Sequence, residues 1–177
     1  MDKTALRRHI RALIRQQSPE ALKAWSQQLA VALEAHPWFS KARSVMLFAA
    51  LPDEPQTHSL LQRHARAKHL FLPAVVGDEI EVRRFRSAQD LRRGAFGIEE
   101  PVGEPLARLA EIDLIVVPGV AFDSEGRRLG RGKGYYDRLL ASPDLRARLL
   151  GYAFPFQIVD RVPVDEHDVR MHGVVRV

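Results

Sequence analysis

The chain has 177 residues, a formal net charge of +5 and no cysteine, which excludes disulfides, thiolate nucleophiles and cysteine-based zinc sites. This length is enough for one domain, and we expect a single domain over residues 1–177. No apolar stretch approaches the roughly 20 residues that span a bilayer, and the basic start lacks the apolar run of a signal peptide, so we expect a soluble, cytoplasmic monomer without a membrane partner.

Two helices are expected at the start of the chain. Over residues 3–16, apolar side chains recur at helical spacing. A second helix follows Ser18, a suitable N-cap, has Pro19 in its first turn, and ends before Pro37. The first helix is amphipathic and rich in arginine, which is also typical of a transit peptide, but Asp2 argues against that interpretation.

Apolar runs of strand length then alternate with helical patterns. Helices are expected at residues 57–67 and from Tyr135, and the turn-rich segment at residues 90–105 indicates an ordered loop. The expected strands cover residues 44–51, 69–75, 79–85, 112–122 and 149–154, with a short one at the end of the tail. The strand at 79–85 alternates only weakly and suits a sheet edge. Together these elements predict an α/β fold, a single three-layer domain with a largely parallel central sheet flanked by helices.

The segment RRLGRGKGYYDRL, residues 127–139, follows the strongest strand candidate. Glycines at positions 130, 132 and 134 remove side chains at every second position, so the backbone can take positive φ and approach a ligand closely. Backbone N–H groups, the start of a helix and neighbouring Arg and Lys side chains together form a phosphate cradle. Open α/β sheets bind ligands at the carboxyl ends of their strands, where this segment lies. The glycine spacing matches neither a Walker A loop nor a dinucleotide fingerprint.

Positive charge gathers in two places. Residues 1–17 and residues 127–138 each hold five Lys or Arg side chains against one Asp. Two local basic clusters suit a compact polyanion such as a nucleoside triphosphate, while a nucleic-acid surface is the competing interpretation. No RNA-binding motif, zinc pattern or repeated aromatic platform supports that competitor. Asp137, beside the cradle, suits Mg²⁺, although an exposed helix residue or an arginine partner would also explain it.

Residues 116–140, VVPGVAFDSEGRRLGRGKGYYDRLL, closely resemble the signature of the 5-formyltetrahydrofolate cyclo-ligase family. That signature is an apolar strand, P-G-x-x-F-D, and then R-x-G-x-G-x-G-Y-Y-D. Four further segments agree with the family in order and spacing, so the resemblance covers essentially the whole chain. They are KTALR (3–7), FAALPDEPQT (48–57), GAFGIEEP (94–101) and VPVDEHD (162–168).

This resemblance implies an enzyme that uses ATP and Mg²⁺ to close 5-formyltetrahydrofolate into 5,10-methenyltetrahydrofolate, with release of ADP and phosphate. The γ-phosphoryl group would pass to the formyl oxygen, giving an iminium phosphate that the anilino nitrogen attacks. Such chemistry rests on positioning and charge neutralisation, which suits a chain with two basic clusters and no cysteine nucleophile. A related α/β enzyme acting on another acid stays open, because the family often has an acid where Gln56 stands.

The resemblance also implies roles for individual residues. Arg128, Lys133 and Tyr135 are expected to be catalytic, and Asp137 and Asp168 to bind Mg²⁺. The residues implied in ATP binding are Lys3, Thr4, Ala5, Leu6, Arg7, Arg128, Leu129, Gly130, Arg131, Gly132, Lys133, Gly134, Tyr135 and Tyr136. The residues implied in substrate binding are Ala49, Glu54, Phe96, Arg131, Gly132, Lys133, Gly134 and Tyr135.

Plainer interpretations of several of these residues stay open when the residues are taken alone. A solvated helix face would equally explain Lys3 and Arg7, which are four apart. A carboxylate such as Glu54 suits the adjacent ring N–H and amino group of a pterin, with Asp53 next to it as the rival. Asp168 would also be explained as the cap of a turn or the partner of a nearby arginine.

Overall fold

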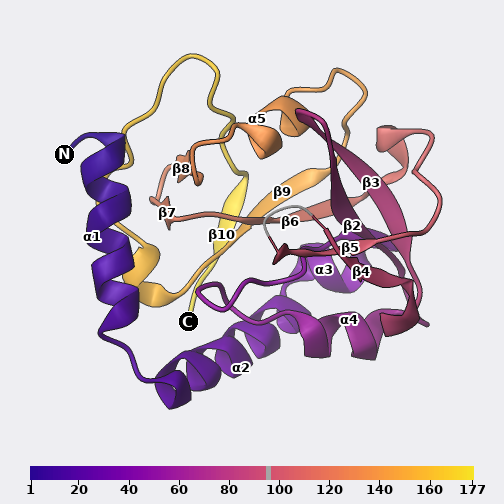
Figure 1. Cartoon of the computed structure of the whole chain (residues 1–177), viewed down its shortest axis with the longest axis horizontal. Coiled ribbons are helices and arrows are strands. Elements are labelled where there is room, and N and C mark those ends of the chain that lie inside the picture. Colours follow the sequence, from indigo (N-terminus) through magenta and orange to yellow (C-terminus); the bar gives the residue numbers. More distant parts are fainter. Residues whose placement is uncertain (95–96) are drawn as a thin grey trace.

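The computed structural model describes residues 1–94 and 97–177 and is built around a six-stranded sheet (Figure 1). The strands lie in the order β10-β9-β6-β1-β2-β3, and every neighbouring pair is parallel except β2–β3. Their bounds are β1 Ser44–Met46, β2 His69–Val76, β3 Glu79–Phe85, β6 Leu114–Pro118, β9 Arg148–Tyr152 and β10 Gly173–Val175. The largely parallel sheet and the edge position of residues 79–85 confirm the sequence prediction.

Helices cover both faces of the sheet, which gives the predicted three layers. The α-helices are α1 Lys3–Arg15, α2 Pro19–Ala35, α3 Pro37–Lys41, α4 His58–His64 and α5 Tyr135–Leu140, with short 3₁₀ turns at Ala88–Asp90, Leu109–Glu111 and Pro155–Gln157. Val45 belongs to the core cluster that includes α2 and α4, whereas its neighbour Met46 belongs to the cluster that includes α5. Because both faces are buried, the inner strands β2 and β6 are nearly continuous apolar runs, unlike the edge strand β3. None of the described helices is long and apolar enough to cross a membrane.

Helix α1 stands at one end of the sheet, beside the chain that leaves β6 (Figure 1). Its buried residues Leu6 and Ile10 pack in one cluster with Leu129 and Val162. The helix begins after Asp2, whose side chain accepts a hydrogen bond from the amide of Ala5 at 2.7 Å. This packing brings the polar residues of the first two turns of α1 next to the glycine-rich segment.

The predicted strand at 44–51 is shorter than expected, because it ends at Met46. The amide of Leu47 still donates to the carbonyl oxygen of Phe71 in β2 at 2.9 Å, and further on the amide of Leu51 donates to Glu54 Oε1 at 3.2 Å. Backbone groups that a longer strand would have paired are therefore used to build the turn that carries Glu54.

The predicted strand at 112–122 is divided into two. Its first part is β6, and the second, β7 (Ala121–Phe122), pairs with β8 (Arg128–Leu129) in a separate two-stranded sheet. The amide of Val120 donates to the carbonyl oxygen of Leu129 at 2.7 Å. The backbone hydrogen bonds of this segment therefore pass from the main sheet to the two-stranded sheet. The start of the glycine-rich segment is thus a strand, which was not predicted, whereas the helix expected from Tyr135 is confirmed as α5.

Three smaller differences complete the comparison with the predicted elements. The segment at 90–105, expected to be a loop, contains the antiparallel strands β4 (Leu91–Arg93) and β5 (Glu99–Pro101). The helix expected at 57–67 ends at His64. Pro37, which was expected only to limit α2, is also the first residue of α3, because a proline suits the first helical position.

Candidate active site

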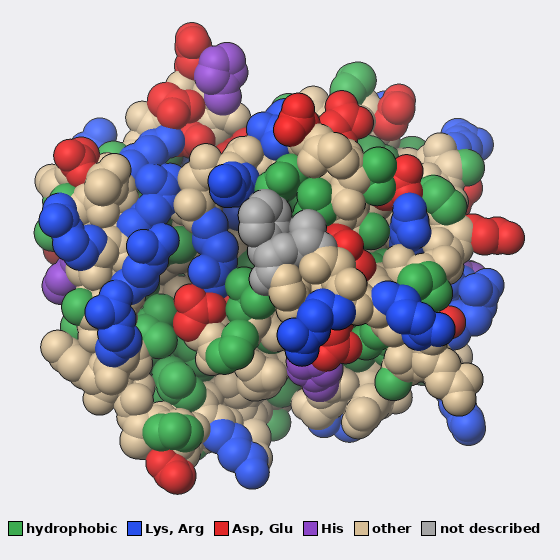
Figure 2. Space-filling view, in the orientation of Figure 1, with side chains coloured by type: hydrophobic (Ala, Val, Ile, Leu, Met, Phe, Trp, Pro, Cys, Tyr) green, Lys and Arg blue, Asp and Glu red, His purple; other side chains and the backbone are tan. Residues whose placement is uncertain are grey.

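A cavity of about 910 Å³ lies at the carboxyl ends of β1 and β6. Its lining residues come from the start of α1, the turn after β1, the glycine-rich segment with the start of α5, the tail at residues 165–169, and a further part formed by β2, β3 and residues 98–100. Lys and Arg side chains gather over α1 and the surface beside it (Figure 2). The cavity therefore joins the two basic clusters of the sequence, at the sheet edge where α/β proteins bind ligands.

The glycine-rich segment forms one wall of the cavity. Gly132 and Gly134 have φ of 108° and 73°, which side chains rarely tolerate, and Gly134 is the N-cap of α5. Gly130 does not take a positive φ, but a Cβ there would lie 3.1 Å from the guanidinium of Arg128. Its carbonyl oxygen accepts from Arg7 Nε at 2.9 Å. Glycines thus shape the wall and connect it to α1.

Arg128 is a buried cation at the base of this wall. Its Nε donates to the carbonyl oxygen of Pro118 at 2.7 Å, and its Nη1 lies 3.7 Å from Asp137 Oδ1. Burial lowers the pKa of Arg128, and the negative charge of Asp137 opposes that change. A buried guanidinium with one distant carboxylate partner is an environment that a bound anion would stabilise.

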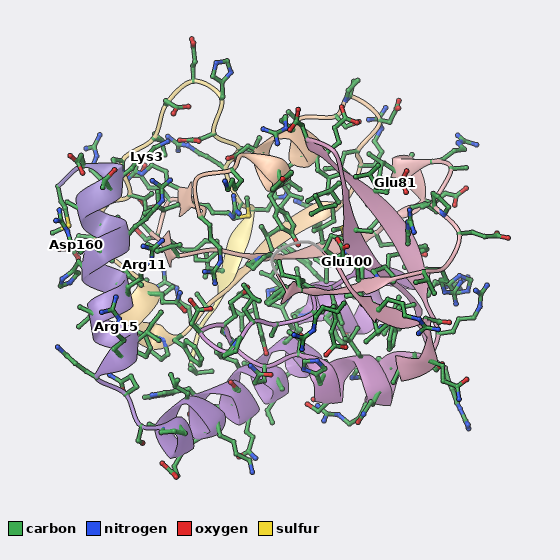
Figure 3. All side chains as sticks on the ribbon, viewed as in Figure 1. Lys3, Arg11, Arg15, Glu81, Glu100 and Asp160 are labelled. Atoms are coloured by element: carbon green, nitrogen blue, oxygen red, sulfur yellow. The ribbon has the colours of Figure 1, made fainter. Side chains whose placement is uncertain are left out.

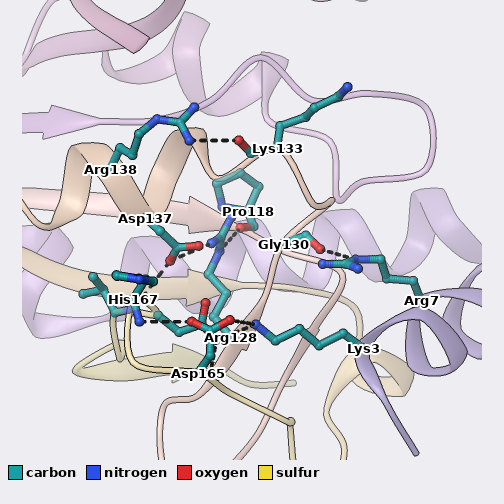
Figure 4. A network of polar contacts seen from close by, with 12 residues as sticks. Lys3, Arg7, Pro118, Arg128, Gly130, Lys133, Asp137, Arg138, Asp165 and His167 are labelled. Carbon is teal, nitrogen blue, oxygen red and sulfur yellow. Dashed lines mark hydrogen bonds and ion pairs between the residues drawn. The ribbon is translucent and has the colours of Figure 1, made fainter. Parts of the chain in front are cut away.

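Lys3 and the tail are joined by ion pairs in the same cavity (Figure 4). Lys3 Nζ donates to Asp168 Oδ2 at 2.7 Å and to Asp165 Oδ2 at 2.9 Å. Burial lowers the pKa of Lys3, but the hydrogen bonds to the two carboxylates outweigh it and raise the pKa overall. Asp168 Oδ2 also accepts from the amide of Asp165 at 2.8 Å. Asp168 therefore caps a turn and pairs with a lysine, instead of an arginine.

The tail also meets the helix that follows the glycine-rich segment. Asp137 Oδ1 accepts from the amide of Val169, the residue after Asp168, at 3.4 Å. Asp137 and Asp168 both line the cavity, and the contact with Val169 holds the tail against the start of α5. Among the described residues, no group of three or more His, Cys, Asp and Glu could hold a metal ion. Any metal here would need ligands from another molecule.

Glu54, on the turn after β1, also lines the cavity and is buried. Burial raises its pKa to about 7, although the charge of Arg131, whose Nη2 lies 3.4 Å from Oε1, acts in the other direction. Arg131 also holds the more exposed Asp53 through hydrogen bonds of 2.8 and 3.2 Å. Gln56 donates to the carbonyl oxygens of Leu51 and Glu54, so it braces the turn. Of the two acids, Glu54 is the one that lines the cavity.

Most of the other expected residues also line this cavity. They are Ala49, Leu129, Lys133, Tyr135 and Tyr136. Thr4 and Ala5 are not among the described lining residues, and Leu6 is buried in the core below α1. Phe96 lies outside the described residues. Arg11 and Arg15 continue along α1 beyond Lys3 and are exposed (Figure 3), which fits the solvated interpretation of that part of the helix.

Two contributors were missed in the sequence. Asp165 forms an ion pair with Lys3, as Asp168 does. The two acids are three residues apart, a spacing that is typical when a side chain caps a turn. Arg138 donates to the carbonyl oxygens of Lys133 and Asp78, which fixes the end of the glycine-rich segment. No sequence pattern signals the second contact, because Asp78 comes from a distant turn.

The family model described as "5-formyltetrahydrofolate cyclo-ligase family" matches residues 1–177. The chain belongs to this family. A mouse 5-formyltetrahydrofolate cyclo-ligase is 29% identical over 98% of this chain and 92% of its own length. The corresponding protein of Escherichia coli strain K12 is 31% identical over 94% and 95%. Membership makes the chain an enzyme of the cyclo-ligase type, as its signature segment indicated.

Solved structures of similar proteins agree with this assignment. The NMR structure of an Aquifex aeolicus 5,10-methenyltetrahydrofolate synthetase is 39% identical, with a TM-score of 0.88 over 99% of this chain and 89% of that one. A Mycoplasma pneumoniae 5,10-methenyltetrahydrofolate synthetase, 23% identical, has a TM-score of 0.78 and supports the fold alone.

Proposed function

We propose that the cavity binds ATP, Mg²⁺ and 5-formyltetrahydrofolate together, and that ATP drives conversion of this folate to 5,10-methenyltetrahydrofolate with release of ADP and phosphate. Family membership supports the folate conversion. The observation that carries the ATP dependence is the convergence of Lys3, Arg7 and Arg128 on a glycine-rich wall, in a cavity that also contains a buried carboxylate. Such a wall suits phosphates, and the carboxylate suits a flat molecule with N–H donors.

The proposed reaction has two group transfers. The formyl oxygen bonds to the γ-phosphorus as the bond to ADP breaks, which gives an iminium phosphate. The anilino nitrogen then bonds to the formyl carbon and loses its proton, and the carbon–oxygen bond breaks with its electron pair leaving on phosphate. The first transfer is needed because the formyl oxygen by itself is a poor leaving group. Both transfers build negative charge on phosphate oxygens, which positioned cations and N–H groups stabilise.

The position of each cationic side chain indicates which phosphate group it would contact. Arg128 is buried at the base of the cradle and would face the transferred phosphoryl group, with Lys133 and Tyr135 as its catalytic neighbours on the same wall. Lys3 and Arg7, on one face of α1, would bind the remaining phosphates. The exposed backbone at Gly132 would add N–H donors, since no side chain covers it.

The donor set at the tail fits Mg²⁺. This hard ion prefers oxygen ligands and usually takes one or two carboxylates together with substrate phosphates. Asp137 and Asp168 supply two carboxylates in one cavity, and the described residues offer no larger cluster. A magnesium ion would therefore be held jointly by these two residues and ATP, and it would neutralise charge on the phosphates.

Binding of ATP and Mg²⁺ would break the ion pair between Lys3 on α1 and Asp168 in the tail and give each side chain a new partner. Lys3 and Asp168 satisfy each other in the protein alone. ATP offers Lys3 a phosphate partner, and Mg²⁺ offers Asp168 a cation. The ion pair thus keeps both side chains in place and free of unpaired charge until the two ligands replace it.

A direct assay tests this function. The purified protein is mixed with ATP, Mg²⁺ and 5-formyltetrahydrofolate, and the near-ultraviolet absorbance of the methenyl product is followed. We expect product only in the complete mixture, and its loss when ATP is omitted or Mg²⁺ is chelated. Product formed at the same rate without ATP would contradict the proposed role of the phosphate cradle.

A further inference from the structure

The proposed reaction does not use Asp123, the last residue of the P-G-x-x-F-D part of the signature. Its side chain is completely buried, and it is not among the described residues that line the cavity. Oδ1 accepts from the amides of Glu125 and Arg127, each at 3.0 Å, and Oδ2 accepts from Arg127 Nε at 2.6 Å and from the amide of Val162 at 2.8 Å. Three of these bonds close a turn over residues 123–127, whereas the fourth connects that turn to the tail, 39 residues further along the chain. A buried carboxylate satisfied in this way fixes the positions of its partners.

The same turn holds the tail at a second point. The amide of Met171 donates to the carbonyl oxygen of Gly126 at 2.7 Å. Gly126 has a φ of 81°, and a Cβ there would lie 2.2 Å from the carbonyl oxygen of Met171, so both the backbone conformation and this close approach require a glycine. Val162 and Met171 are themselves buried. Residues 163–170, the tail loop, therefore have both of their ends fixed on the turn at residues 123–127.

The tail loop carries two of the acids in the cavity (Figure 4). Asp165 and Asp168 form ion pairs with Lys3. The amide of Val169 donates to Asp137. Binding of ATP and Mg²⁺, as proposed, would break the ion pair between Lys3 and Asp168, and with it one of the contacts that hold the loop from the cavity side. The two contacts with the turn involve no described lining residue of the cavity, so they can hold the loop while ligands are bound.

We propose that Asp123 is a positioning residue for the proposed magnesium site: its bond to the amide of Val162 holds the tail loop so that Asp168 lies where it can bind the ion. This inference rests on the proposed function. Asp123 touches neither substrate nor metal and acts through the backbone of the tail loop. The chain enters the phosphate cradle at Arg128, directly after the turn, so one turn sets the place of the metal ligand relative to the cradle. Loss of a residue that orients a metal ligand typically weakens metal binding about 10–100-fold.

The variant Asp123→Asn tests this role, because an amide cannot accept all the hydrogen bonds that the carboxylate accepts, and either the turn or its connection to the tail is loosened. Arg127→Gln is the matched control, since it breaks the same buried ion pair and leaves the carboxylate bonded to Val162. Calorimetry gives the Kd of a non-hydrolysable ATP analogue with and without Mg²⁺. We expect equal Kd values for all three proteins without Mg²⁺. With Mg²⁺, the Kd of Asp123→Asn should be about 10-fold higher than that of the wild type, and the Kd of Arg127→Gln should match the wild type.

Gly126→Ala replaces Asp123→Asn if the latter is insoluble. The added Cβ must displace Met171 at the other end of the tail loop, and it should weaken binding with Mg²⁺ in the same way. A Kd with Mg²⁺ that is unchanged in the soluble variant, or raised equally in Arg127→Gln, would overturn the inference alone. A wild-type protein in which Mg²⁺ does not tighten binding of the analogue would instead overturn the proposed metal site, and the inference with it.

Discussion

Replacing Glu54 by glutamine should stabilise the protein and damage its function at the same time. Glu54 has a pKa of about 7 instead of 4.5 because burial disfavours its charged form. The folded state therefore binds more protons than the unfolded state between these pH values, and stability falls as pH rises through that window. A shift of this size corresponds to about 3 kcal/mol. Glutamine cannot ionise, so above pH 7 the variant avoids the loss of stability that ionisation of Glu54 causes in the wild type.

The expected result is a difference that depends on pH. At pH 8 the Tm of Glu54→Gln should exceed that of the wild type by about 5–10 °C, and at pH 5 the two should nearly coincide. Glutamine still offers Oε1 to the amide of Leu51, and Arg131 keeps its bonds to Asp53. The apparent KM for 5-formyltetrahydrofolate should rise far more than that for ATP, because an amide presents one donor where the pterin needs an acceptor.

Thermal unfolding across pH and steady-state kinetics with each substrate varied measure the two effects. Asp53→Asn is the control, because it removes the neighbouring acid, which is partly exposed and does not line the described cavity. It should not reproduce the rise in Tm at pH 8. A Glu54→Gln protein that is less stable than the wild type at pH 8, or whose KM values for both substrates change equally, would refute the reasoning.

Two further predictions concern the phosphate side. Arg128→Ala should raise the apparent KM for ATP, since loss of one charge-assisted contact costs on the order of 1.5–3 kcal/mol. The control Arg15→Ala, on the exposed part of α1, should leave that KM unchanged. An Arg128→Ala protein that is folded and has unchanged ATP kinetics would remove Arg128 from the site. Asp137→Asn and Asp168→Asn should each raise the Mg²⁺ concentration for half-maximal activity, with Asp137→Asn the more severe; an unaltered Mg²⁺ titration in either variant would exclude that residue as a ligand.

The parts of the fold that sequence patterns predicted are those in which local signals and packing agree. The apolar run at 69–75 and the helix after Ser18 needed no knowledge of distant contacts. The strands at 44–51 and 112–122 were predicted too long, because apolar character continues where the hydrogen bonds change partner. In the second case, Val120 pairs with Leu129 across a hairpin, and such a pairing leaves no periodic trace in the sequence.

The candidate site could be assembled from the sequence only as a set of residues. The signature segment and the basic residues of α1 were identifiable, and the structure brings them to one cavity. The ion pair between Lys3 and Asp168 joins positions 165 residues apart, so no local pattern reports it. The raised pKa of Glu54 likewise follows from its burial by distant segments.

An ATP-dependent cyclo-ligase must couple ATP cleavage to ring closure, and this coupling can be measured. ADP and 5,10-methenyltetrahydrofolate are measured together in the same reaction, with Mg²⁺ present and each substrate omitted in turn. We expect equal amounts of ADP and methenyl product, and neither of them when ATP or the folate is left out. Methenyl product that accumulates without matching ADP would contradict the proposed ATP dependence.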